Sequence, residues 1–163
     1  MNITLMAHDK KKELMVQFCT AYKSILMRHN LFATATTGRL VSDATGLPIT
    51  LFLAHSQGGH QQVDARVSYN EIDLVLMFAD PNNIDPWEDQ QLMHTIHLCD
   101  THNVPIATNL ATAEMLIRPM GEIPFFKTFR KPKYSAPSAR VMITAVGSRA
   151  GELRPVRQCC RII

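Results

Sequence analysis

One stretch of the chain, Ile72–Phe78, is almost wholly apolar, and this constrains the fold more than any other feature. A strand that is apolar at consecutive positions is typical of a parallel sheet covered by helices on both faces. The rest of residues 1–117 agrees, because segments with strand character alternate with segments of helical spacing. Strands are predicted at 2–6, 31–34, 49–54, 72–78 and 104–107, and helices at 10–29, 37–44, 60–69, 88–102 and in a short segment ending at Ile117. The sequence therefore predicts an α/β fold with a parallel sheet between two helical layers.

Composition sets the broad class of the protein. The chain has 163 residues, of which 46% are hydrophobic and 19% charged, as expected of one globular domain. No apolar run approaches the roughly 20 residues that span a bilayer, so no membrane segment is expected. Asp9 and Lys10–Lys12 interrupt the N-terminal apolar residues, so we expect no signal peptide. The four cysteines form no spaced framework, which favours reduced thiols and a cytoplasmic protein.

Charge divides the chain into two parts. Residues 1–117 contain 7 Lys and Arg against 12 Asp and Glu, whereas residues 118–163 contain 10 against 2. Prolines interrupt the second part, and only 141–146 has the pattern of a strand. The sequence predicts a folded domain over 1–117 and a basic extension over 118–163. For the extension, a solvated segment is favoured over a nucleic-acid surface.

Polar residues gather where the predicted strands end. The loops at the carboxyl ends of the five strands are 8–12, 34–37, 55–60, 80–83 and 108–109. In open parallel sheets, ligands bind beyond these ends. Thr34, Thr36 and Thr37 lie at the start of a predicted helix whose first N–H groups have no internal partners, which suits a phosphate. The alternative is that Thr36 or Thr37 only caps this helix. Taken together, the loops predict a site for a small anionic ligand.

Several motifs resemble the methylglyoxal synthase family over about residues 2–117. They occur in the family's order and nearly at its spacing. They are Ala7-His8-Asp9 with Lys12, Ala33–Gly38, Gly58-Gly59-His60-Gln61-Gln62-Val63, Ile72–Pro81, Cys99–Pro105 and Ala107–Asn109 with Thr112-Ala113-Glu114. The resemblance implies a Rossmann-like fold, a homohexamer and a lyase that eliminates phosphate from dihydroxyacetone phosphate to give methylglyoxal. It implies no metal and no organic cofactor.

The resemblance also implies roles for individual residues. By position, the catalytic groups are His60, Asp9 and Asp80. The groups that bind substrate and phosphate are His8, Lys12, Thr34, Ala35, Thr36, Thr37, Ala54, His55 and Gly59. The reaction needs a base that takes a proton beside the ketone, and fixed donors for the enediolate and the phosphate.

Four departures from the family pattern fall in this site. His60 stands where the family has Asp, and Trp87 where it has His. Ala54-His55-Ser56-Gln57 replaces a Ser-Gly-Pro loop, and Ala35 replaces Gly. Two interpretations follow: a lyase in which a neutral His60 imidazole replaces the carboxylate base, or a catalytically impaired relative that binds phosphate or regulates. His94 and His97 lie three residues apart and are interpreted as helix-surface residues, so no metal site is predicted.

Overall fold

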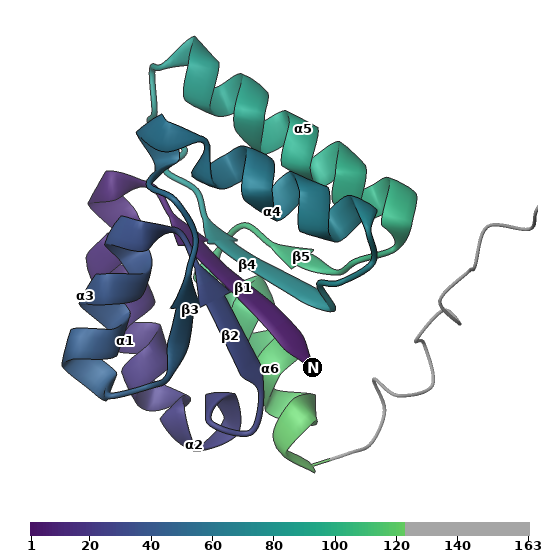
Figure 1. Ribbon diagram of the computed structural model, residues 1–163. Helices are drawn as coiled ribbons and strands as arrows, with labels where there is room; N and C mark the ends of the chain where they lie inside the picture. Colours follow the sequence, from purple (N-terminus) through teal and green to yellow (C-terminus); the bar gives the residue numbers. More distant parts are fainter. Residues whose placement is uncertain (123–163) are drawn as a thin grey trace, which may run out of the picture. The chain divides into compact units, whose positions relative to one another are not determined.

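The computed structural model describes residues 1–122, and Figure 1 shows its central sheet. The five strands are β1 (Asn2–Ala7), β2 (Asn30–Ala33), β3 (Ile49–Leu51), β4 (Leu74–Phe78) and β5 (Ile106–Ala107). They are all parallel and lie in the order β3-β2-β1-β4-β5. The α/β prediction is therefore confirmed.

Helices cover both faces of this sheet (Figure 1). Residues of α1 (Lys12–Ala21), α2 (Lys23–Leu26), α3 (Ala35–Thr45) and α6 (Leu110–Glu122) pack on one face. Residues of α4 (Gly59–Ser68) and α5 (Pro86–His102) pack on the other. Two short 3-10 helices, η1 (Asp9–Lys11) and η2 (His55–Gln57), follow strand ends. Their position at the carboxyl ends of strands matters for the site described below.

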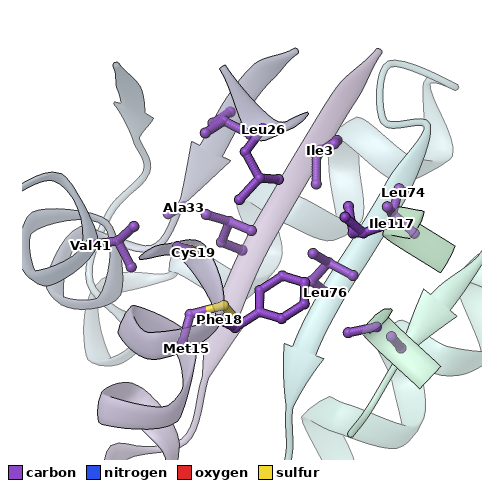
Figure 2. Packing of buried hydrophobic residues seen from close by; sticks show 14 of the residues in the cluster. Ile3, Met15, Phe18, Cys19, Leu26, Ala33, Val41, Leu74, Leu76 and Ile117 are labelled. Carbon is purple, nitrogen blue, oxygen red and sulfur yellow. The ribbon is translucent and has the colours of Figure 1, made fainter. Parts of the chain in front are cut away.

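The apolar stretch that predicted two-sided burial forms β4, and all five of its residues are buried. Leu74, Leu76 and Phe78 join the cluster that contains Phe18 of α1, where Figure 2 shows Leu74 and Leu76 beside Ile117. Val75 and Met77 point to the opposite face and pack with residues of α4 and α5. Alternate side chains of one strand thus serve two separate cores, which is why the segment has no polar face.

The boundaries of several elements differ from the prediction. The segment 10–29 is not one helix but η1, α1 and α2, because the N–H of Ile25 bonds to the Tyr22 carbonyl three residues earlier and tightens the turn. β3 ends at Leu51, since the N–H of Leu53 donates to Gln62 Oε1 instead of to a strand. α6 continues past Pro119 to Glu122, whereas the prediction ended at Ile117.

The strand order places a topological switch between β1 and β4. The connection from β1 leads to β2 on one side, and the connection from β3 returns to β4 on the other. Loops leaving β1 and β4 therefore diverge at the carboxyl ends of these strands, which is where such sheets bind ligands. No helix within residues 1–122 has the length and apolarity needed to cross a membrane. The predicted strand at 141–146 lies outside the described residues.

Candidate active site at the carboxyl ends of the strands

His8 and Asp80 meet at the topological switch. The N–H of Asp80 donates to Nδ1 of His8 at 3.0 Å, and both residues are buried. Since Nδ1 accepts this bond, the neutral ring carries its proton on Nε2, where it can be donated to a ligand. The Asp80 carboxylate accepts from the N–H of Asn82 and lies 3.5 Å from Lys10 Nζ. The Asn82 bond is the main reason why the pKa of Asp80 is lowered, and Asp80 is therefore ionised at neutral pH.

Lys12 brings a positive charge to the same edge of the sheet. Its Nζ lies 2.6 Å from Asp9 Oδ1; the Lys12 side chain is mostly buried, whereas that of Asp9 is exposed. The hydrogen bond and charge of Lys12 lower the pKa of Asp9, and charge interactions with His55 and His8 add to this. The Asp9 carboxylate is thus ionised and lies near the two imidazoles.

The threonine turn opens α3 two residues earlier than predicted. The helix begins at Ala35 with Thr34 as its N-cap residue, so Thr36 and Thr37 lie in the first turn and the capping interpretation is wrong for both. The Thr34 hydroxyl lies 3.4 Å from that of Thr37, and the N–H of Ala35 donates to the carbonyl of Leu53. This turn combines hydroxyl groups with the positive end of the helix dipole, which suits an anion.

Gly59 determines how closely α4 approaches the chain after β3. Its N–H donates to the Ala54 carbonyl at 3.0 Å. A Cβ at this position would lie 2.3 Å from the Leu53 carbonyl oxygen and 3.0 Å from that of Ala54, so a side chain does not fit. Gly58 precedes it with φ of +94°, a conformation that favours glycine. The two glycines therefore fold the loop back so that His55 and His60 come together.

The His55 and His60 rings contact each other edge to face, with centroids 4.4 Å apart. His60 is 4% exposed, and its Nδ1 has no hydrogen-bond partner within residues 1–122. Burial lowers the pKa of His60 to about 4, and the nearby His55 and His8 contribute further. His60 is therefore a neutral imidazole at pH 7, able to accept a proton and costly to leave charged.

A cavity of about 310 Å³ lies beside His55, between the η2 loop and the start of α5. Asp85 is the N-cap of α5 and its carboxylate accepts from the N–H of Trp87 at 2.9 Å. Trp87 is 60% exposed at this helix start. The lining residues are His55, Ser56, Gly58, Gln61, Asp85, Trp87, Glu88 and Gln91.

Comparisons with known proteins agree with this geometry. A family model described as "MGS-like domain" matches residues 14–108. A methylglyoxal synthase from Caldicellulosiruptor saccharolyticus is 54% identical over 118 residues, covering 72% of this chain and 83% of the relative. The chain belongs to the methylglyoxal synthase family. Among other members, a methylglyoxal synthase from Listeria monocytogenes serotype 4a is 49% identical over 121 residues, which cover 74% of this chain and 90% of the relative.

A solved member of the methylglyoxal synthase family has the same fold. The crystal structure of the enzyme from Elizabethkingia anophelis matches with a TM-score of 0.66 and 32% identity. The match covers 77% of this chain and 79% of that one. The resemblance stated from the motifs is therefore confirmed for family and fold.

Within this family member, several predicted residues lie in one neighbourhood. His8 binds Asp80, His55 contacts His60, and Asp9 responds to the charges of both His8 and His55. The Ala35 bond to Leu53 brings the start of α3 next to the loop that carries Ala54. Among buried polar side chains of residues 1–122, five of eight belong to this edge, namely His8, Thr34, Thr37, His60 and Asp80. Among these residues, the buried His60 has an Nδ1 that is unpartnered within the described part of the chain, and a buried polar atom of this kind needs an explanation such as a ligand.

Other residues escaped the sequence analysis or lie elsewhere. Glu88 lies near His55 and was not among the predicted site residues; its place directly after Pro86-Trp87 was the available signal. Asn83, which belongs to the predicted loop 80–83, donates to Glu88. His94 lies outside the edge: its Nδ1 is 2.9 Å from Asp64 Oδ2, on the layer of α4 and α5. No group of three His, Cys, Asp or Glu within the described residues is arranged to hold a metal ion.

Proposed function

We propose that the chain is a methylglyoxal synthase, a carbon–oxygen lyase that eliminates phosphate from dihydroxyacetone phosphate to give methylglyoxal. The observation that carries this proposal is the identity of 54% over 118 residues to a relative of that name. The ionised, buried and hydroxylated groups at the carboxyl ends of the strands support it, because the substrate combines a phosphate with a ketone.

In the proposed complex the phosphate lies at the start of α3. Lys12 supplies charge, and the hydroxyl groups of Thr34, Thr36 and Thr37 supply donors. Ala35, Ala54, His55 and Gly59 complete the binding loops. The Nε2–H of His8, oriented by its bond from Asp80, donates to the ketone oxygen as the enediolate forms.

The neutral imidazole of His60 is the base in this proposal. It takes a proton from the carbon beside the ketone, and the enediolate then expels phosphate from the neighbouring carbon. Asp9 and Asp80 are the ionised carboxylates of the site, and the charges of His55 and His8 help to lower the pKa of Asp9. No metal or organic cofactor takes part in these steps.

The partners of the proposed enzyme are the phosphorylated substrate and the inorganic phosphate that leaves. We further propose a homohexamer in the cytoplasm, on the basis of the family. A measurement of molar mass by light scattering tests the hexamer directly.

A second candidate function is binding of phosphate or a phosphorylated metabolite without turnover. One observation favours it: His60 is deeply buried, and its low pKa makes it a weak base. The start of α3 and Lys12 would bind phosphate equally well in either case.

The test is an assay of the full chain with dihydroxyacetone phosphate in which methylglyoxal and phosphate are followed together. We expect equal amounts of both products, and a loss of about 100-fold or more in kcat for His60→Gln. His97→Gln is the matched control because His97 is exposed on α5, away from the site. Absence of methylglyoxal, with phosphate still raising the melting temperature, would establish the binding function instead.

A further inference from the structure

His55 faces a carboxylate that the sequence motifs did not point to. Nε2 of His55 lies 3.8 Å from Oε1 of Glu88, and each side chain is 33% exposed. The other carboxylate oxygen, Oε2, accepts from Nδ2 of Asn83 at 2.7 Å, which fixes the orientation of Glu88. An oriented carboxylate at this distance stabilises the protonated form of an imidazole and leaves Nδ1–H of that ring free to donate.

The cavity beside His55 contains few other groups that could exchange a proton. Asp85 is engaged as the cap of α5, and the indole of Trp87 does not titrate. The charged or titratable groups around His55 are Glu88 of α5, Asp85 at the N-cap of α5, His60 of α4 and Asp9 of η1. Of the two imidazoles in this group, His55 is the one that lies beside the Glu88 carboxylate. Imidazole is the side chain suited to proton exchange near pH 7.

The two neighbouring imidazoles have opposite environments. His60 is buried, lacks a partner at Nδ1 and is held neutral. His55 borders the cavity and pairs with Glu88. Two neighbouring titratable groups in such different surroundings, one buried and one beside a cavity and a carboxylate, are suited to separate roles as base and acid.

We propose that protonated His55, held by Glu88, is the general acid that protonates the phosphate group as it leaves the substrate. This inference rests on the proposed lyase function and names a residue for its second step. Glu88 acts through His55 and is a positioning residue.

The proposed steps balance in atoms and charge. His60 removes a proton from the carbon beside the ketone and gives the enediolate. The carbon–oxygen bond to phosphate then breaks, its electron pair leaves with the phosphate, and the proton on Nδ1 of His55 goes to a phosphate oxygen. The hydroxyl proton of the enediol returns to His55 as the aldehyde forms. His60 returns its proton to the methylene carbon, which becomes the methyl group of methylglyoxal.

The test compares two variants with two controls in the full chain. His55→Gln removes the acid and Glu88→Gln removes its carboxylate partner. The controls are His97→Gln, an exposed imidazole of α5, and Asp89→Asn, which removes a charge from the same first turn of α5. For each protein, kcat and KM are measured from pH 5 to 9, and circular dichroism confirms folding.

We expect His55→Gln to lower kcat by about 100-fold with a much smaller change in KM. Glu88→Gln is expected to retain activity at low pH and to move the basic limb of the kcat profile down by about half a pH unit, because the imidazolium loses its partner. Both controls are expected to keep the wild-type profile. If His55→Gln does not fold, the profile of Glu88→Gln decides by itself.

Different failures are distinguishable. If the wild-type chain makes methylglyoxal and both variants keep its kcat and pH profile, the role of His55 is overturned and the lyase function stands. A rise in KM without a change in kcat for His55→Gln would also overturn it, since that result limits His55 to phosphate binding. If the wild-type chain makes no methylglyoxal, the lyase function and this inference fail together.

Discussion

His60 links the stability of the folded chain to pH. Its pKa is about 4 in the folded protein and 6.5 in its ordinary state, so between these values the unfolded chain binds a proton that the folded chain does not. The free energy of unfolding should therefore fall as the pH is lowered from 6.5, by up to about 3 kcal/mol once the pH is below 4. Chemical denaturation measured at several pH values tests this.

The contribution of His60 is isolated by comparing the pH dependence of the free energy of unfolding in the wild-type chain and in His60→Gln. This variant should lose the His60 component between pH 6.5 and 4, whereas His97→Gln should retain it, because His97 is exposed. Parallel curves for the wild-type chain and His60→Gln would show that His60 titrates normally, and its assignment as a neutral base would then be wrong.

The location of a site residue could be predicted from the sequence where that residue follows the end of a predicted strand. His8 and Asp80 are 72 residues apart, yet each follows a predicted parallel strand, and they form a hydrogen bond. The closeness of His55 to Glu88 could not be predicted, because it depends on where η2 and the start of α5 lie in space. The cap of α3 was misassigned since three threonines in four positions make several boundaries equally compatible with the pattern.

At the scale of elements, the start of α5 depends on Asp85. Its carboxylate accepts from the N–H of Trp87, and Pro86 occupies the first helical turn. Asp85→Ala should lower the free energy of unfolding by about 1 kcal/mol, which corresponds to a melting temperature lower by about 2–4 °C. Asp89→Ala is the control, since it removes a carboxylate from the same turn without removing a cap. Equal losses in the two variants would mean that charge near the helix dipole, rather than the cap, stabilises this end.

The elements themselves were predictable from periodicity, but their ends were not. The wholly apolar β4 was predicted correctly as a strand buried on both faces, because no other arrangement shields every side chain. The break in the segment 10–29 comes from a local tightening at Tyr22, and the apolar spacing continues through it into Leu26, which is fully buried. The spacing of apolar residues indicates which face of a helical segment is buried. A break in the helix that keeps the same face buried therefore leaves no signal in the sequence.

At the scale of the whole molecule, the prediction of a parallel sheet did not include the order of its strands. Alternating strands and helices are compatible with several orders, and the pairing of β1 with both β2 and β4 follows from tertiary packing. This pairing creates the switch point and places the loops after β1 and β4 at the centre of the candidate site. The predicted boundary between the domain and the basic extension stays a prediction, as does the hexamer.

Binding of phosphate at this edge should stabilise the molecule as a whole, because the proposed site combines the start of α3 with loops after β1 and β3, which come together only in the folded chain. Phosphate at 100 times its dissociation constant should add about 2.7 kcal/mol to the free energy of unfolding, or about 5–10 °C in melting temperature. Measured in a phosphate-free buffer with phosphate added back, this shift should be largely lost in Lys12→Gln, because Lys12 brings a mostly buried positive charge to the edge.

Lys23→Gln is the control, since Lys23 is exposed at the start of α2, which lies away from the carboxyl ends of the strands. A shift of equal size in Lys12→Gln and Lys23→Gln would mean that phosphate stabilises the chain through general salt effects and would remove the support for an anion site. A shift confined to proteins with Lys12 would locate the bound phosphate near the Lys12 ammonium group, as the proposed site requires.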